Sequence, residues 1–230
     1  MRSFVIPAHN EEAFLGATLG ALRTSAEALG GPFEIIVVDD GSTDGTASLA
    51  RSLGATVLQV THRHIGASRN AGARIARGDV LVFVDADTLV PPDTLAAVEA
   101  ALARGAIGGG ARARLEDDAP RWARVFWTGV LVAFRLHIAA GCFIFARREA
   151  FEAAGGFDET YLYSEEIHFS RALKRHGRFV VVRAAVTTSA RKFKAVSLWQ
   201  FIAQVTRLGA SGWSGLKRRH DWWYGRQRER

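Results

Sequence analysis

Two aspartates, Asp85 and Asp87, stand two residues apart where a predicted strand ends, in the segment GDVLVFVDADT. On an extended backbone, side chains two residues apart project to the same side, roughly 7 Å from each other. This spacing suits one divalent cation held against the oxygens of a diphosphate, because Mg²⁺ is usually bound by one or two carboxylates plus phosphate and water oxygens. The same pair also occurs where a strand simply turns, so its interpretation depends on the residues around it.

Polar residues follow two earlier predicted strands in the same way. The segment PAHNEE follows a strand over 3–7, and Asp39-Asp40-Gly41-Ser42 ends a strand over 34–39. In open α/β sheets, ligands bind outside the carboxyl ends of the strands. Turn preferences explain any one of these clusters, but three of them indicate a ligand site along one edge of the sheet.

The elements that must position these residues alternate between strand and helix. Nearly continuous apolar strands separated by helices predict a mostly parallel sheet with helices on both faces, a doubly wound α/β unit. In the first half we expect strands over 3–7, 34–39, 56–60 and 80–84, and helices over 11–29, 43–53, 66–76 and 92–103.

The second half departs from strict alternation. We expect strands over 106–115, 140–146, 180–182 and 186–188, and helices over 121–135, 149–154, 164–176 and 195–213. The last helix is amphipathic, with Leu198, Ile202 and Val205 on one side. The expected organisation is one catalytic domain over 1–213 and a basic, aromatic tail over 214–230.

Size and composition suit one enzyme-sized domain, at 230 residues and 48% hydrophobic. The single cysteine, Cys142, forms no internal disulfide, and no signal peptide is visible, so we expect a cytoplasmic protein. The apolar run over 125–134 is far shorter than the ~20 residues that span a bilayer. It is interpreted as a buried helix or as an interfacial helix that touches membrane or acceptor.

The formal net charge is +7, and the tail carries much of it. Between Lys217 and Arg230 there are six Lys or Arg and two acids, which is +4 and leaves +3 for the rest. Interleaved with Trp222, Trp223 and Tyr224, these cations suit the anionic surface of the inner face of a membrane. A solvated, frayed terminus is the alternative, and no nucleic-acid partner is expected because no such module is recognisable.

Five segments occur in one order along the chain: PAHNEE, VVDDGSTDGT, ASRNAG followed by GDVLVFVDADT, GCFIFARREAFEAAGGFDE, and SEEIHFSRALKRHG. Together they resemble the family 2 glycosyltransferases of the GT-A fold, from about residue 4 to residue 189. The resemblance implies an enzyme that transfers a sugar from a nucleotide-diphosphate donor, such as a UDP- or GDP-sugar. It also implies a divalent cation, Mg²⁺ or Mn²⁺, as cofactor.

The resemblance assigns the nucleoside of the donor to the first two strand ends. Pro7, Ala8, Glu11 and Asp40 would line the base and ribose, with Asp39 close by. A carboxylate is a good acceptor for imino N–H groups and ribose hydroxyls. The alternative for the two aspartates is capping of the following helix, and both roles are compatible.

The resemblance assigns the diphosphate to cations and to the metal. Asp85 and Asp87 would bind the metal, with Asp85 also near the ribose. Arg69 would lie beside the donor, because its charge is permanent and its donors are forked; an exposed helix charge is the alternative. Arg191 and Lys192 would close over the diphosphate.

The resemblance assigns proton transfer to Glu165 and Glu166, at the start of a predicted helix. Glu166 matches the general base of the family, although Glu replaces the usual Asp, and Glu165 is the fallback. Acids in a first helical turn also favour the helix dipole. Asp158 and Gly141 would shape the sugar and acceptor pocket, and His168 has no assigned role.

The expected reaction is therefore a metal-assisted, inverting single displacement to an acceptor hydroxyl or a lipid phosphate. Two other functions fit the sequence less well. A non-catalytic nucleotide-sugar-binding module should have lost Asp87 or the pair Glu165-Glu166, and both are present. A sugar-nucleotide pyrophosphorylase should carry a Gly-rich, basic phosphate loop where this chain has PAHNEE.

Overall fold

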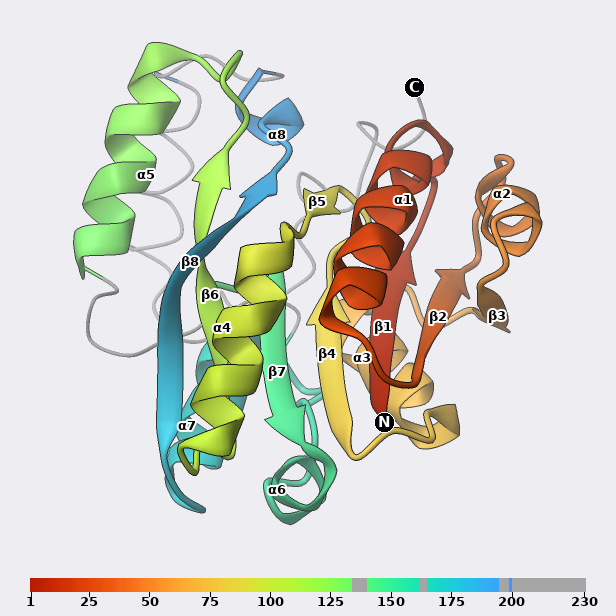
Figure 1. Ribbon diagram of the computed structural model, residues 1–230. Coiled ribbons are helices and arrows are strands. Elements are labelled where there is room, and N and C mark those ends of the chain that lie inside the picture. Colours follow the sequence, from red (N-terminus) through yellow and green to blue (C-terminus); the bar gives the residue numbers. More distant parts are fainter. Residues whose placement is uncertain (134–139, 162–164, 195–198, 200–230) are drawn as a thin grey trace.

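The structure is a computed structural model, and it describes residues 1–133, 140–161, 165–194 and 199. Its centre is an eight-stranded sheet in the order β3-β2-β1-β4-β7-β6-β8-β5. β1 pairs in parallel with β2 and β4, β2 with β3, and β6 with β8, while β7 and β5 run in the opposite direction. The mostly parallel α/β sheet expected from the sequence is thus confirmed (Figure 1).

The strands and helices have the following bounds. The strands are β1 Arg2–Ala8, β2 Phe33–Asp40, β3 Thr56–Val60, β4 Val80–Val84, β5 Thr88–Leu89, β6 Gly108–Leu115, β7 Phe143–Arg147 and β8 Phe179–Thr188. The helices are α1 Glu12–Leu29, α2 Thr46–Ser52, α3 Ile65–Ile75, α4 Pro92–Ala103, α5 Arg121–Ala133, α6 Arg148–Ala153, α7 Glu165–Lys174 and α8 Arg191–Lys194.

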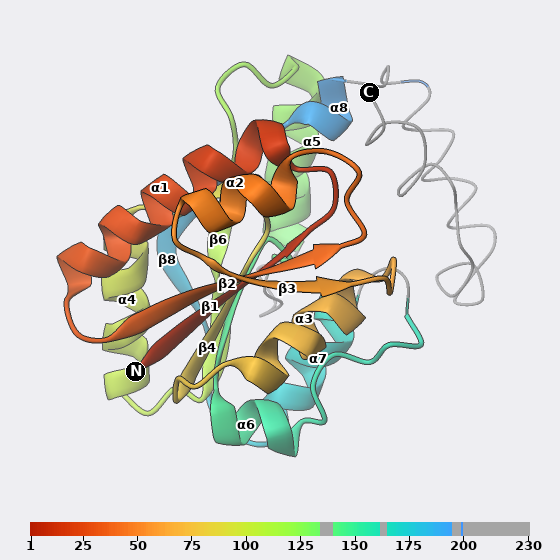
Figure 2. The ribbon, with the colours of Figure 1, turned by 90° about the vertical axis from the view of Figure 1, so that its right-hand side faces the viewer.

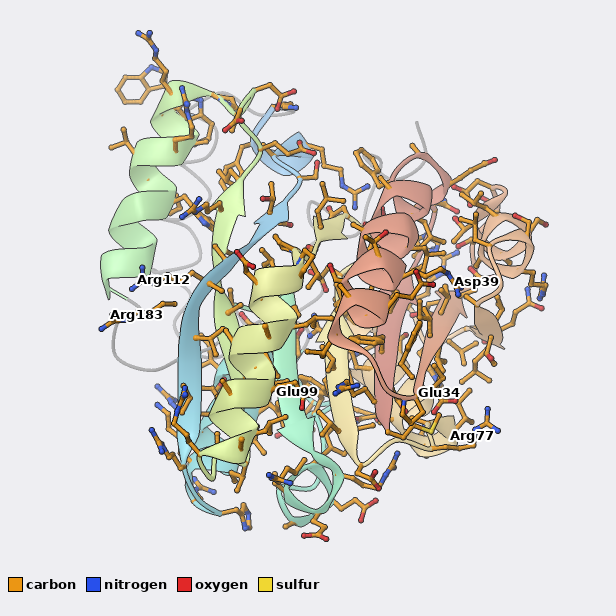
Figure 3. All side chains as sticks on the ribbon, in the orientation of Figure 1. Glu34, Asp39, Arg77, Glu99, Arg112 and Arg183 are labelled. Carbon is orange, nitrogen blue, oxygen red and sulfur yellow. The ribbon has the colours of Figure 1, made fainter. Side chains whose placement is uncertain are left out.

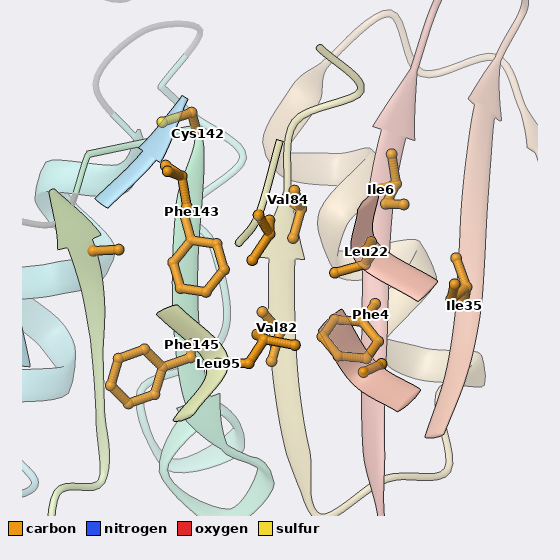
Figure 4. Close-up of a cluster of buried hydrophobic side chains, with 14 of the residues drawn as sticks. Phe4, Ile6, Leu22, Ile35, Val82, Val84, Leu95, Cys142, Phe143 and Phe145 are labelled. Carbon is orange, nitrogen blue, oxygen red and sulfur yellow. The ribbon is translucent and has the colours of Figure 1, made fainter. Parts of the chain in front are cut away.

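Helices cover both faces of the sheet. Figure 2 shows α1, α2 and α4 on one side and α3, α6 and α7 on the other. Alternate residues of each strand feed the two apolar clusters between them: Phe4 and Ile6 of β1 join the first cluster, and Val5 joins the second. The first cluster is drawn in Figure 4, where Phe143 and Phe145 of β7 extend it. This two-sided burial is why the strands are apolar at nearly every position.

The ends of the elements follow the local sequence. α1 buries Leu15, Leu19 and Leu22 on one stripe and ends at Gly30, whose φ of 74° suits glycine. α4 begins with proline in its first turn, where the missing N–H costs no helical hydrogen bond. α3 is capped at its start by His64, whose side chain accepts a hydrogen bond from the Ala67 N–H.

Several boundaries differ from the expectation. The strands predicted over 180–182 and 186–188 are one strand, β8, because its pairing with β6 continues past a register shift between Ala111 and Arg112. The short elements β5 and α8 were not predicted, since neither has a periodic pattern. The predicted helix over 195–213 and the tail over 214–230 fall, apart from residue 199, outside the described residues.

The packing of α3 onto β1 and β2 requires a glycine at position 72. A Cβ added to Gly72 would lie 2.4 Å from Val5 Cγ1 and 2.8 Å from Val38 Cγ2. We expect Gly72→Ala to destabilise the fold by about 1–3 kcal/mol, as overpacked cores do. The matched control is Gly20→Ala, an exposed position in α1 with no atom within 4 Å of the added Cβ, which should be stabilising by about 0.5–1 kcal/mol. Urea denaturation of both variants checks this, and equal stabilities would contradict it.

Candidate active site

The polar clusters at the strand ends meet at one edge of the sheet. β1, β2 and β4 are neighbours and run parallel, so the residues that follow them lie side by side. The second half of the chain returns to this edge through α7 and through α8, which lies next to the amino-terminal end of α1 in Figure 1. Contacts between these distant segments build the site.

Arg69 of α3 is the centre of the first group of contacts. Its side chain is 1% exposed, and it donates to Glu165 Oε1 at 2.7 Å, to Asp85 Oδ1 at 2.9 Å and to the Gly141 carbonyl at 2.8 Å. Burial alone would lower the pKa of Arg69, but the carboxylates of Asp85, Glu165 and Glu166 outweigh it and raise this pKa. The guanidinium also lies 5.2 Å from the ring centre of Phe157. Arg69 is therefore a buried link between the predicted metal and base residues, and not an exposed helix charge.

Glu165 and Glu166 have different surroundings although they are adjacent. Glu165 is buried and bound by Arg69, whereas Glu166 packs against Gly141, where an added Cβ would lie 3.4 Å from Glu166 Cδ. Burial, and next the charge of Glu165, raise the pKa of Glu166 to about 8, with Arg69 opposing. A carboxylate with a pKa near the working pH suits a general base.

The raised pKa of Glu166 predicts a loss of folding stability between about pH 4.5 and pH 8. In this range the unfolded chain ionises Glu166 and the folded chain does not, so stability is greatest below the unfolded pKa. Glu166→Gln removes this pH-dependent loss of stability, because glutamine does not ionise. The substitution should therefore raise the melting temperature at pH 8 relative to the unmodified protein, with little change at pH 4. Glu149→Gln is the control, an exposed acid in the first turn of α6. An equal effect of both substitutions at pH 8 would contradict the prediction.

A second group of contacts joins Glu11, Asp87 and Arg191. Arg191 Nη2 donates to Glu11 Oε1 and lies 3.2 Å from Asp87 Oδ2. Burial would lower the pKa of Arg191, but the hydrogen bond to Glu11 and the charge of Asp87 raise it. The guanidinium stacks 4.7 Å from the ring centre of Phe14. The structure thus brings together three predicted site residues from opposite ends of the chain, while the side chain of Lys192 lies outside its described part.

Asp39 and Asp40 point to opposite sides of β2 and have different partners. Asp40 accepts hydrogen bonds from the Arg63 N–H at 2.8 Å, the His64 N–H at 3.0 Å and Ser68 Oγ at 2.9 Å, so it holds the start of α3. Among the residues that the structure describes, Asp39 accepts two long hydrogen bonds of 3.3 Å, from the Ser42 N–H and from Gln59 Nε2. Asp40 therefore does not cap the following helix, since α2 starts after Gly45 without a side-chain cap. It holds the segment that leads into α3 instead, and Asp39 has more acceptor capacity for a ligand.

His9 and Arg63 are polar neighbours of this site that the sequence analysis did not single out. His9 Nδ1 lies 2.9 Å from the Asp40 carbonyl, and Arg63 Nη1 lies 2.8 Å from His9 Nε2. Because a guanidinium only donates, Nε2 must be the acceptor and Nδ1 carries the proton. Arg63 also has a φ of 49°, which is uncommon for a residue other than glycine. This unusual backbone has no signal in the sequence.

Three other predicted residues lie at or near this edge. Pro7 and Ala8 are buried at the end of β1, before the loop that carries Glu11. Asp158 Oδ1 accepts from the Thr160 N–H at 2.9 Å and from Thr160 Oγ1 at 2.7 Å, which is a turn-forming contact. A role of Asp158 toward the sugar stays a prediction.

Comparison with known proteins decides the family. Residues 3–155 match the sequence pattern described as Glycosyl transferase family 2. The chain belongs to glycosyl transferase family 2. The chain is 35% identical to undecaprenyl-phosphate 4-deoxy-4-formamido-L-arabinose transferase of Pseudomonas aeruginosa. The aligned 147 residues cover 60% of this chain and 42% of the relative. The chain is also 39% identical over 105 residues to validoxylamine A glucosyltransferase of Streptomyces hygroscopicus, covering 43% and 25%. The chain thus spans less than half the length of these relatives.

Solved structures share the fold of this family 2 member at lower identity. Mannosyltransferase PcManGT from Pyrobaculum calidifontis, in complex with GDP-Man and Mn²⁺, superposes with a TM-score of 0.66 at 23% identity, covering 90% of this chain and 64% of that one. Glucosyl-3-phosphoglycerate synthase from Mycobacterium tuberculosis, with Mn²⁺ and UDP, has a TM-score of 0.62 at 22% identity, covering 96% and 80%. These likenesses establish the GT-A fold of the chain.

The carboxylates at the end of β4 fit the divalent cation that this fold implies. Within the described part of the chain, no set of three or more His, Cys, Asp or Glu side chains gathers to hold a metal. Asp85 is 28% exposed at its side chain, and only its Oδ1 has a partner among the described residues. Asp87 is 11% exposed, and its Oδ2 lies 3.2 Å from Arg191 Nη2, so a cation bound here would share this carboxylate with Arg191. Asp85 and Asp87 together suit a Mg²⁺ or Mn²⁺ whose shell is completed by diphosphate oxygens and water.

Proposed function

We propose that this family 2 member is a metal-dependent, inverting glycosyltransferase that uses a nucleotide-diphosphate sugar. The observation that carries the proposal is the contact set of Arg69, which joins Asp85 of the predicted metal site to Glu165 beside the predicted base. The donor diphosphate and the acceptor hydroxyl must lie within a few ångströms of each other for transfer. Arg69 contacts a residue suited to bind each: Asp85 on the metal side and Glu165 beside the base. A binding module would have no use for the second carboxylate pair.

The donor contacts follow from the geometry of the strand ends. Asp39 is the better candidate than Asp40 for the base or ribose, because Asp40 already accepts three hydrogen bonds from the protein. Pro7 and Ala8, at the end of β1, would line the nucleoside site. Arg191, now held by Glu11 and Asp87, has a permanent charge and forked donors suited to the diphosphate.

The chemistry at the sugar is a single displacement. Asp85 and Asp87 would hold a divalent cation, which when bound would supply positive charge to stabilise the departing diphosphate. An acceptor oxygen attacks the anomeric carbon from the side opposite the diphosphate, and the bonding electrons leave with the nucleotide diphosphate. Glu166 takes the proton of an acceptor hydroxyl, for which its raised pKa is suited.

The acceptor that we favour is a hydroxyl or phosphate presented by a lipid. The support is the similarity to undecaprenyl-phosphate 4-deoxy-4-formamido-L-arabinose transferase, whose name gives undecaprenyl phosphate as the acceptor. Of the helices that the structure describes, none combines the length and hydrophobicity that crossing a membrane requires. The enzyme would then meet its acceptor from the inner, cytoplasmic face of the membrane.

A panel of UDP-, GDP- and dTDP-sugars, titrated with and without Mn²⁺ or Mg²⁺, tests the proposal. We expect one nucleotide class to bind, and metal to tighten binding. Asp87→Asn should remove the metal effect, weakening metal-dependent binding by about tenfold or more, since each ion–carboxylate contact contributes more than 1.4 kcal/mol. Asp93→Asn is the control, an acid in the first turn of α4. If no nucleotide diphosphate binds and Asp87→Asn has no effect, the enzyme proposal fails.

A further inference from the structure

One end of the molecule carries an unbalanced group of cations. β8 contacts both β6 and α7, and the acids of these three elements are confined to Glu165 and Glu166, which face the candidate site. Residues 167–188 contain no Asp or Glu, and neither do 101–115. The exposed cations of these elements and of the connection between α7 and β8, here called the basic face, are Arg112, Arg114, Arg171, Lys174, Arg175, Arg178 and Arg183.

No member of the basic face forms an ion pair with another described residue. On the other side of the molecule Arg77 pairs with Glu34 at 3.2 Å, while the exposed Arg51 and Arg74 form no ion pair with a described residue either. The basic face is therefore distinguished by the number of its cations and by the lack of acids in 101–115 and 167–188. Like charges on adjacent strands repel each other. A surface that keeps several of them without carboxylates suits an anionic partner.

The register shift in the sheet concentrates this charge. Ala111 pairs with Val182 and Arg112 with Ala185, so Arg183 and Ala184 are extra residues of β8 at that point. Such irregularities re-aim side chains. Figure 3 shows Arg112 and Arg183 projecting together from the same side of the molecule, opposite to Arg77.

The neighbouring helix adds apolar surface to this side. α5 stands beside Arg112 and Arg183 (Figure 3), with Val125 74% exposed and Phe126 37% exposed. Arg121 and Arg124 of the same helix are also exposed. Apolar and cationic residues together are typical of a helix that lies in a membrane interface, whereas an exposed aliphatic side chain has no role on a nucleic-acid backbone.

We infer that the basic face and α5 dock the protein onto the surface of an anionic phospholipid bilayer. α7 connects this surface to the chemistry, because its first turn holds Glu165 and Glu166 and its last turn holds Arg171 and Lys174. Ten residues of helix span about 15 Å, so the docked surface lies within reach of the candidate base. The inference rests on the proposed function in one respect: docking on the membrane would give the enzyme access to a lipid-linked acceptor.

Vesicle binding of the full chain tests the inference. Vesicles of phosphatidylcholine alone are compared with vesicles of equimolar phosphatidylcholine and phosphatidylglycerol, by co-sedimentation at low and high salt. The test variant is Arg112→Gln, Arg175→Gln, Arg183→Gln, and the control is Arg51→Gln, Arg74→Gln, Arg77→Gln. The control removes the same charge from exposed positions on α2 and at the end of α3.

We expect the full chain to prefer the anionic vesicles and to lose this preference at high salt. Each interfacial arginine contributes a factor of about five, so the test variant should bind about a hundredfold more weakly and the control within about twofold of the parent. Val125→Ser should weaken vesicle binding further, while Leu53→Ser, exposed on the other side, should not. Equal binding of the two triple variants, or no preference for anionic vesicles, overturns the inference. Tighter binding to a short duplex DNA, lost in the same test variant, overturns it as well.

Nucleotide-sugar binding, measured without vesicles, separates this inference from the proposed function. The test variant should bind the donor as the parent does, because none of its three positions lies in the candidate site. Failure of every form to bind a donor would remove the proposed function and leave the vesicle result standing.

Discussion

Glu166→Gln should bind the nucleotide-sugar donor with unchanged affinity and lose about 10²–10⁴-fold in turnover with a hydroxyl acceptor, the usual contribution of a general base. The amide keeps the shape of the side chain but cannot take a proton. With a phosphate acceptor the loss should be smaller, because a phosphate dianion has no proton to give. Steady-state transfer assays and donor titration check the two expectations separately.

The pH dependence of kcat/KM tests the role of Glu166 independently. The pKa of Glu166 is raised to about 8, so the base form accumulates as the pH rises and kcat/KM should increase through this range. Glu165→Gln is the matched substitution, which disturbs the Arg69 contact and not the base. Retained turnover in Glu166→Gln, with turnover lost in Glu165→Gln, would assign the base to Glu165.

Arg69→Met should be the most destabilising single substitution in the site. Removing a 1% exposed guanidinium leaves Asp85 and Glu165 without their shared partner, and breaking a buried ion pair typically costs about 3–5 kcal/mol. Donor binding should also weaken, because the metal carboxylate loses its orientation. Urea denaturation, at a pH where the carboxylates are ionised, measures the loss.

A double substitution shows whether charge or packing explains that loss. Arg69→Met with Glu165→Gln removes the uncompensated carboxylate as well, and should recover part of the stability lost in Arg69→Met alone. Arg69→Lys should recover less than half, because one ammonium cannot reproduce the forked contacts to Glu165, Asp85 and the Gly141 carbonyl. If the double variant is less stable than the single one, the buried charge is not the cause.

The general architecture was accessible from the sequence because its patterns are local. Continuous apolar strands, helical stripes such as Leu15, Leu19 and Leu22, and a proline or glycine at helix ends set most elements to within a few residues. β3 and β4 have the predicted bounds. The error at β8 arose because a register shift against β6 breaks the pattern without ending the strand.

The candidate site was predicted residue by residue, but not its connections. The family resemblance indicated Asp85 and Asp87 at a strand end, Glu165 at a helix start and Arg69 within a helix. No local pattern indicated that Arg191 binds Glu11, a contact across 180 positions of the chain. The choice between Asp39 and Asp40 likewise depends on hydrogen bonds that only the folded chain makes.

By itself, the sequence determined the fold class, the polar edge of the sheet and the net charge, because these follow from the period of apolar residues and from composition. Only the tertiary structure decided that Arg69 is buried, that Glu165 and Glu166 differ, and that cations gather without acids at one end. Burial and pairing arise from segments far apart in the chain, and they control pKa and ion-pair energy. The separate environments of two adjacent glutamates are therefore a property of the fold.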